Sequence, residues 1–201
     1  MAVIRNIYKL IDHFSSFTVL PVDPDDVRDQ IISYGIKDEI EFVGVTLDTR
    51  IIYGAFHQHI RRDGVYAEPV ICADIYYDTS LTRDWRRLVC CKELLHILDH
   101  SVSKTASKME CENLVTHLAD FTLESPFSRE KLQAWTDELM MFHAAAVLFP
   151  WDARESLYRD YCQDNTRLDE IIKAVDLPES VVRLVLSEGW PNLYNTLSGG
   201  K

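Results

Sequence analysis

The sequence predicts an α+β protein, in which a small antiparallel sheet packs against one central helix and the C-terminal half is mostly helical. Three observations predict this class. Apolar side chains recur at helical spacing near the N-terminus, residues 41–77 hold β-branched and aromatic stretches between turn-forming residues, and helical spacing returns from residue 85 onward. With 201 residues and 47% hydrophobic content, the chain is long enough for one domain with a sizeable core.

Two helices are expected before the sheet. The first spans residues 3–17, where apolar side chains at helical spacing form one face. The second follows Asp23, which is placed to cap it, and Pro24 takes its first position, where a missing amide hydrogen breaks no helical bond. Gly35 is expected to end this second helix.

The β-forming stretches are residues 41–48, 50–60 and 65–77. Between the last two, residues 61–64 (Arg-Arg-Asp-Gly) have the composition of a hairpin turn. Pro69 is typical of an edge strand or a bulge, because it has no amide hydrogen to donate to a neighbouring strand. Two or three antiparallel strands are therefore expected.

The central helix is expected over residues 85–100, with Asp84 as its N-cap. Its apolar face is formed by Leu88, Cys91, Leu95 and Leu98. Residues 92–96 read Lys-Glu-Leu-Leu-His, which differs at position 92 alone from His-Glu-x-x-His, the helix motif of zinc metalloproteases. In that motif, two histidines one turn apart hold the metal and the glutamate activates the metal-bound water.

Beyond the central helix the sequence predicts mainly helices. The expected segments are 108–123, then 128–149 with Ser128 as N-cap and Pro150 after its end, then 152–163, and two short helices within 168–190. Residues 139–149 are almost wholly apolar and are expected to be buried.

The predicted organisation is a single domain over 1–190 and a tail over 191–201. Within the domain, 1–80 hold the first helices and the sheet, 81–150 the central and long helices, and 151–190 a helical extension.

Composition and charge exclude several classes of protein. The formal net charge of −11 argues against broad binding to nucleic acid, whose phosphates would repel the chain. No apolar run approaches the roughly 18 residues that a membrane span needs. The N-terminus lacks the apolar core of a signal peptide, so a cytoplasmic protein without a membrane partner is expected. The five cysteines contain no Cys-x-x-Cys pair and are expected to be reduced thiols.

Several segments match, in their order along the chain, one family of proteins. They are Pro21-Val22-Asp23 with Tyr34-Gly35-Ile36, then residues 86–96, then residues 144–150, and finally residues 177–182 (Leu-Pro-Glu-Ser-Val-Val). Together they resemble the ImmA/IrrE (DUF955) family of zinc-metallopeptidase-like proteins. The resemblance covers most of the chain and implies a zincin-like fold.

The same resemblance implies roles for individual residues. His96 corresponds to the second zinc-ligating histidine of the family and Glu93 to its general base. Asp137 or Glu138 corresponds to the third, acidic ligand, and Lys92 stands where the family has its first ligand. The family includes phage- and mobile-element-linked proteases that cleave repressors, so the resemblance also implies a regulatory role with a protein partner or a peptide substrate.

Lys92 separates the functions that such a site can have. A lysine side chain, whose pKa is ordinarily about 10.4, is an ammonium group at neutral pH and has no lone pair for a metal. Losing one of three protein ligands is expected to weaken zinc binding severely. The leading hypothesis is therefore a pseudoenzyme without a cofactor, in which Lys92 pairs with Asp137 or Glu138 and replaces the positive charge of the metal.

An alternative hypothesis is an active metal-dependent endopeptidase with an altered ligand set. His96 and His100 are also one helical turn apart, with Asp99 beside them, and zinc bound there would take further ligands from Asp137, Glu138, Glu110 or Glu112. A second version of this hypothesis uses Lys92 itself as base or ligand.

The remaining candidates favour structural roles. His57 and His59 share one face of a strand, a pattern found in some metal sites, but exposed strand histidines are the expectation. His143 lies in an apolar helix and is expected in the core. Cys90 and Cys91 point apart on a helix and are expected to be buried thiols rather than a redox pair. In the two-helix unit over 168–190, acidic residues outnumber basic ones, which favours packing or protein contact over DNA binding.

Overall fold

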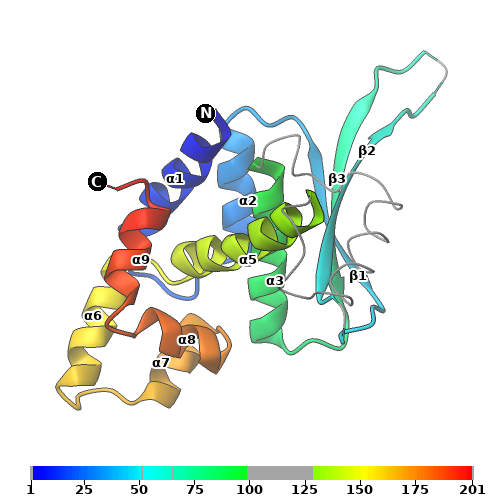
Figure 1. Ribbon diagram of the computed structural model, residues 1–201. Helices are drawn as coiled ribbons and strands as arrows, with labels where there is room; N and C mark the ends of the chain where they lie inside the picture. The colour runs from blue at the N-terminus through cyan, green and yellow to red at the C-terminus, as the bar shows by residue number, and fades with distance from the viewer. Residues whose placement is uncertain (1, 51, 65, 99–128, 201) are drawn as a thin grey trace.

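The computed structural model of the chain describes residues 2–50, 52–64, 66–98 and 129–200. In chain order the elements are α1 (Ala2–Ser15), α2 (Pro24–Ser33), β1 (Glu39–Val45), β2 (Gly54–Arg61), β3 (Val70–Asp78), α3 (Arg83–Leu95), the 3₁₀ turn η1 (His96–Leu98), α5 (Arg129–Leu148), α6 (Trp151–Cys162), α7 (Leu168–Val175), α8 (Glu179–Val185) and α9 (Trp190–Leu197). The strands stand on one side of the molecule and the helices gather on the other (Figure 1). The expected α+β class is confirmed.

The sheet is mixed, which corrects the expectation of an antiparallel one. β3 lies between the other two strands and pairs antiparallel with β2 but parallel with β1. The 24 residues from position 46 to 69 contain β2 and are long enough for the crossover that parallel strands require. Alternating apolar residues suit both directions of pairing, so the sequence pattern did not reveal the direction of β1.

The two faces of the sheet have different surroundings. One face packs against the helices, and α3 contacts both β2 and β3 there. Its buried apolar side chains are Ile40, Phe56, Ala73 and Ile75. The opposite face carries the imidazole groups of β2 and the carboxylate of Asp74. This division places the central helix against the apolar face.

α2 begins and ends where the sequence predicts. Asp23 is its N-cap residue, and the Asp23 carboxylate accepts a hydrogen bond from the backbone N of Asp25 at 2.9 Å. Pro24 follows in the first turn. Beyond the C-cap residue Tyr34, Gly35 has a φ of 88°, a left-handed conformation that glycine adopts without a steric penalty.

The central helix, α3, is offset from its expected bounds. Thr82 occupies the N-cap position, so the expectation that Asp84 caps the helix is wrong. Asp84 instead lies in the first turn, where its negative charge complements the positive end of the helix dipole. Regular α-helix stops at Leu95, and His96 is the C-cap residue from which η1 continues.

α5 crosses α3 and packs against it (Figure 1). Met140 and residues 144–149 are buried, as the apolar run predicts. His143 is buried among them, and its Nδ1 lies 3.0 Å from the carbonyl oxygen of Leu139, one turn earlier. The expectation of a core histidine is confirmed. The helix expected over 108–123 and the N-cap expected at Ser128 lie outside the described residues.

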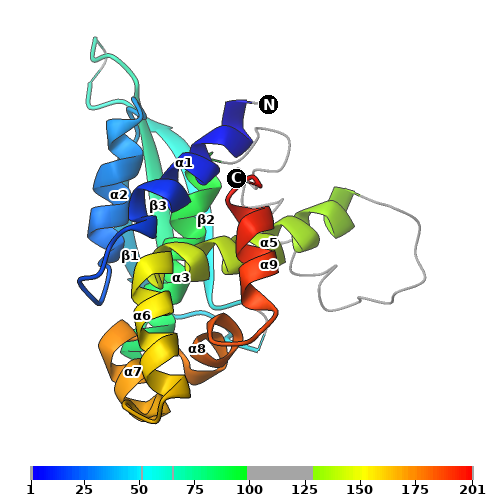
Figure 2. The same cartoon turned by 90° about the vertical axis from the view of Figure 1, so that its left-hand side faces the viewer.

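The C-terminal segment ends in a packed helix where the sequence predicts a tail. Trp190, Tyr194 and Leu197 form one face of α9 and are buried. α9 contacts α5, and the two lie side by side in both views (Figures 1 and 2). The spacing of these three side chains is helical, but Pro191 and the polar residues around it obscured the signal.

Candidate functional site

The chemistry-bearing residues of the central helix meet near its C-terminal end. Lys92 is 9% exposed and Glu93 is 3% exposed, while His96 lies one turn further on, partly buried. Charged side chains are seldom buried without a partner. The contacts of Lys92 and Glu93 therefore decide what the site can do.

Lys92 and Glu93 form an ion pair. Nζ of Lys92 lies 2.8 Å from Oε1 of Glu93, although adjacent helix residues normally point apart. Among the described residues, Oε1 accepts no hydrogen bond of good geometry, so the contact is mainly electrostatic. The second carboxylate oxygen, Oε2, lies 3.9 Å from Nε2 of His96, beyond hydrogen-bonding distance. The carboxylate thus faces a cation on one side and an imidazole on the other.

The start of β2 passes close to α3 beside this ion pair. A Cβ atom built on Gly54 would lie 2.4 Å from Cγ1 of Val89, 2.7 Å from the backbone oxygen of Tyr76 and 3.3 Å from Cγ of Glu93. Only glycine lets the strand approach so closely. The rings of Phe56 and His96 are stacked with centroids 6.3 Å apart, so β2 also covers the imidazole.

The described donors do not fit the zinc site of a metallopeptidase. His96 offers an imidazole, but the first ligand position holds the Lys92 ammonium, which has no lone pair. Glu93, the position of the general base, is already paired with that ammonium. The side chains of α3 therefore present a charge-paired cluster rather than a ligand set.

The other predicted ligands cannot be placed against this cluster. Asp137 and Glu138 belong to α5, which packs against α3, but their side chains lie outside the described part of the structure. His100 also lies outside the described residues. The hypothesis that Lys92 pairs with Asp137 or Glu138 stays a prediction. The remaining ligand candidates, Asp99, Glu110 and Glu112, fall in the same undescribed segment.

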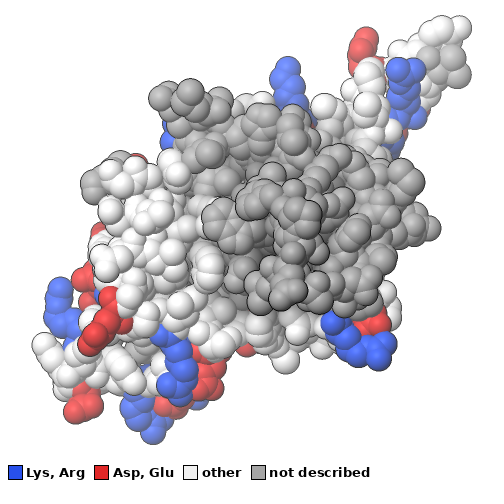
Figure 3. Space-filling model, in the orientation of Figure 1, with Lys and Arg blue, Asp and Glu red and all other residues white. Residues whose placement is uncertain are grey.

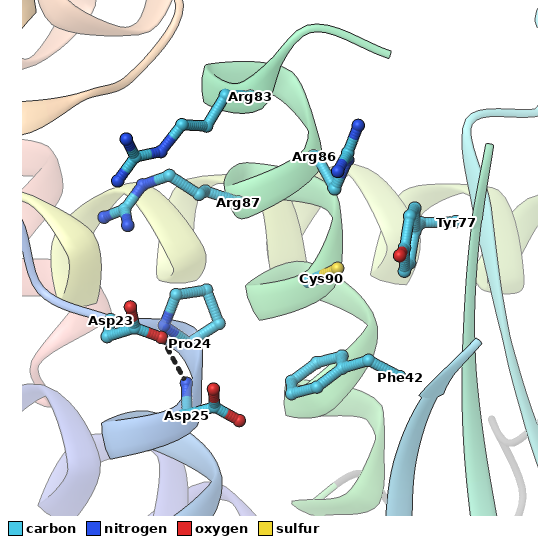
Figure 4. A pocket seen from close by; sticks show the side chains of 9 residues that line it. All are labelled: Asp23, Pro24, Asp25, Phe42, Tyr77, Arg83, Arg86, Arg87 and Cys90. Carbon is cyan, nitrogen blue, oxygen red and sulfur yellow. Dashed lines mark hydrogen bonds between the residues drawn. The ribbon is translucent and has the colours of Figure 1, made fainter. Parts of the chain in front are cut away.

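A pocket that the sequence analysis missed opens at the other end of α3. It has a volume of about 220 Å³ and lies between the starts of α2 and α3 and strands β1 and β3 (Figure 4). Its lining residues are Asp23, Pro24, Asp25, Phe42, Tyr77, Arg83, Arg86, Arg87 and Cys90. The signal in the sequence was the presence of three arginines, Arg83, Arg86 and Arg87, in the first turns of the central helix.

The arginines of this pocket are already engaged. Arg83 and Arg87 extend in the same direction (Figure 4), and both pair with Asp176, at 2.9 and 3.3 Å. Arg86 points the other way, and its guanidinium lies 5.3 Å from the centre of the Tyr77 ring. The carboxylates of Asp23 and Asp25 also line the pocket, so its three arginines are accompanied by three nearby acidic groups. This balance argues against a dedicated site for anions.

The expectation of buried thiols in α3 is confirmed. Cys90 and Cys91 are buried free thiols. Burial raises the pKa of Cys90 to about 12, and burial also raises the pKa of Cys91 well above its usual range. Both groups stay protonated near neutral pH, which removes the thiolate that redox or nucleophilic chemistry needs.

The two-helix unit α7–α8 packs against the rest of the protein. Its inward side chains are Ile171, Val175, Leu177, Val181, Val182 and Val185, all buried. On the face shown in Figure 3, acidic and basic side chains are interspersed over the region of α6–α8, without a basic surface. This arrangement agrees with packing or protein contact better than with DNA binding.

In comparisons with protein-family models, curated proteins and solved structures, nothing matches this chain significantly. No helix of the described residues is long and apolar enough to span a membrane.

Proposed function

We propose that this chain is a non-catalytic, zincin-like protein of the ImmA/IrrE type, linked to phage or mobile elements, that acts by binding another protein. The observation that carries the proposal is the ion pair between Lys92 and Glu93 inside the motif helix. The resemblance in sequence supports the family assignment. The ion pair supports the proposed loss of catalytic activity.

The ion pair accounts for a site that works without metal. A buried glutamate needs a nearby positive charge, and in the metallopeptidase motif the zinc ion provides it. In this chain the Lys92 ammonium lies 2.8 Å from the Glu93 carboxylate and supplies that charge. Without a metal-bound water to activate, the Glu93 carboxylate has no substrate for base catalysis, so on this proposal the scaffold is retained and the chemistry is lost.

The pocket at the start of α3 favours binding of a partner protein over binding of a peptide substrate. The pocket at the start of the helix is lined by arginine and aromatic side chains, which are residue types enriched at protein interfaces. This pocket lies at the opposite end of α3 from Lys92, so binding there needs nothing from the degenerate motif.

The alternative function is an active metal-dependent endopeptidase with an altered ligand set. It is favoured by the proximity of Glu93 and His96, which still face each other at 3.9 Å. On this hypothesis His96 and His100 hold the metal together with Asp137 or Glu138. The two functions differ in whether the motif helix binds zinc.

Metal content tests this difference. The starting protein for this test, called the parent, is the His57→Ala/His59→Ala double variant. It is used so that zinc bound by these two strand histidines is not counted. Into it we introduce Lys92→His, and as a matched control Lys92→His with His96→Ala. Each protein is loaded with zinc, desalted and measured by mass spectrometry of the metal.

We expect no zinc in the parent, about one zinc per chain with Lys92→His, and none again in the control. Stoichiometric zinc in the parent would contradict the pseudoenzyme and support the alternative. Replacing His96, His100, Asp137 and Glu138 in turn would then locate the ligands. If Lys92→His stays empty, the zincin-like ligand arrangement itself is wrong.

A further inference from the structure

We propose that His57, His59 and Asp74 form a binding site for one divalent transition-metal ion, with Zn²⁺ as the preferred ion, on the sheet face turned away from α3. The site lies on β2 and β3 and shares no residue with the motif helix. It is independent of the function proposed above.

The sheet register brings the three side chains together. His57 and His59 alternate onto the same face of β2, because they are two residues apart on a strand. His57 lies directly opposite Asp74 in the antiparallel β2–β3 pair, and His59 is the next residue on that face. The sequence reveals the two histidines, but the position of Asp74 follows only from the pairing.

The distances between the three ligand atoms are close to those found around one bound metal ion. Nδ1 of His59 lies 3.6 Å from Oδ2 of Asp74, Nδ1 of His57 lies 4.0 Å from the same oxygen, and the three ligand atoms lie within 4.8 Å of one another. Two ligands bound to one tetrahedral zinc at the usual 2.0–2.1 Å are separated by about 3.3–3.4 Å. Small side-chain rotations would therefore close the site.

The two imidazoles lie next to each other beside the same carboxylate. Their rings are nearly parallel, with an interplanar angle of 15° and centroids 5.2 Å apart, and both Nδ1 atoms face the Asp74 carboxylate. Nδ1 of His59 is buried and has no hydrogen-bond partner among the described residues. An unpartnered buried nitrogen is costly in a protein, and a metal ion would satisfy it.

Neighbouring groups support the carboxylate as a ligand. The Tyr76 hydroxyl donates a hydrogen bond to Oδ2 of Asp74 at 3.0 Å and so orients it, as outer-shell donors do in metal sites. On the other side, Glu41 of β1 is the cross-strand neighbour of Asp74 and adds negative charge to the same face.

The ligand set indicates the class of ion. Two imidazoles and one carboxylate suit zinc and other borderline transition metals better than Mg²⁺ or Ca²⁺, which prefer oxygen ligands. The side chains of His57 and His59 are 34% and 36% exposed, so the site lies close to solvent.

A zinc titration tests the site. Metal-free wild-type protein is titrated with Zn²⁺ in competition with a chromophoric zinc chelator. We expect about one zinc per chain, and a Kd raised at least about tenfold by each of His57→Ala, His59→Ala and Asp74→Asn. Two matched controls, His13→Ala at an exposed position on α1 and His96→Ala on the motif helix, should leave the Kd unchanged.

Thermal unfolding separates lost ligands from lost folding. Zinc should raise the Tm of the wild type, because it binds the folded state, and should not raise the Tm of the three site variants. Their metal-free Tm should match that of the wild type. If an alanine variant does not fold, His59→Gln replaces it, because glutamine keeps a polar side chain of similar size. Zinc should likewise fail to raise the Tm of this variant.

The outcomes also distinguish this proposal from the pseudoenzyme. Absence of zinc uptake by the wild type, or uptake that persists in the His57→Ala/His59→Ala double variant, would overturn the sheet site. Uptake lost with His96→Ala but kept in the double variant would place the ion on the motif helix and contradict both proposals. Uptake lost only with the strand variants supports the sheet site, whatever the result of Lys92→His.

Discussion

Arg87 and Asp176 join the motif helix to the C-terminal helices across 89 positions of the chain. Nε of Arg87 donates a hydrogen bond to the backbone oxygen of Asp176 at 3.1 Å and lies 3.3 Å from its Oδ2. Nη2 of the same guanidinium donates to the carbonyl oxygen of Val22, before α2, at 2.5 Å. One buried arginine thus ties α3 to two other parts of the fold, and burial lowers its pKa while Asp176 opposes that shift.

Replacing Arg87 should therefore destabilise the whole protein. Arg87→Met removes a buried cation and leaves the carbonyl oxygens of Val22 and Asp176 without their donor, so we expect a loss on the order of 3 kcal/mol in the free energy of unfolding. Arg83 contacts the same Asp176 but its side chain is 75% exposed, so Arg83→Met should cost less than about 1 kcal/mol. Urea unfolding of both variants measures the difference, and equal losses would contradict the assigned role of Arg87.

Gly54 should not tolerate a side chain. A Cβ at this position would clash with Val89 and with the backbone of Tyr76, at 2.4 and 2.7 Å. Because backbone cannot rotate out of the way, we expect Gly54→Ala to destabilise the protein by about 1–3 kcal/mol. Gly64→Ala is the matched control, since nothing lies within 4 Å of its added Cβ. A Gly54→Ala variant as stable as this control would show that β2 does not lie against α3.

The buried ion pair makes a prediction about charge removal. Lys92→Met leaves the Glu93 carboxylate buried without its partner, so we expect a loss of about 3–5 kcal/mol. Lys92→Met combined with Glu93→Leu removes both charges and should recover most of that loss. Chemical denaturation of Lys92→Met, of Glu93→Leu and of the double variant, each compared with the wild type, forms a double-mutant cycle. Additive effects would mean that the two groups do not interact.

Asp78 should make stability depend on pH in the acid range. Its pKa is lowered by hydrogen bonds from the Ser80 hydroxyl and from the backbone N atoms of Leu47 and Ser80. A lowered folded-state pKa contributes stability that is present above the unfolded pKa, about 3.9, and is lost as the pH falls through the folded value.

We therefore expect wild-type stability to fall as the pH drops below about 4, and Asp78→Asn to show a shallower fall at lower overall stability. Ser80→Ala removes only the hydroxyl donor and should give an intermediate slope. Thermal unfolding between neutral and acid pH measures the three slopes. Parallel curves for all three proteins would contradict this account.

Much of the local structure could be predicted from the sequence. The cap at Asp23, the end of α2 near Gly35, the buried run over 144–149 and the core position of His143 all follow from residues within a few positions of one another. Capping, turn formation and helical periodicity depend on such short-range relations. The motif at 92–96 was visible for the same reason.

Other features could be decided only by the tertiary structure. The parallel pairing of β1 with β3, the contact of Arg87 with Asp176 and the placing of Asp74 opposite His57 each join residues far apart in the chain. No local pattern specifies such pairs, because they depend on how separate elements pack. The sequence by itself determined the cap and end of α2, the burial of residues 144–149 and the order Lys-Glu-Leu-Leu-His at 92–96, because these depend on residues close together in the chain. The packing decided that α9 is a buried helix, that Glu93 meets Lys92 and that the strand histidines lie beside a carboxylate.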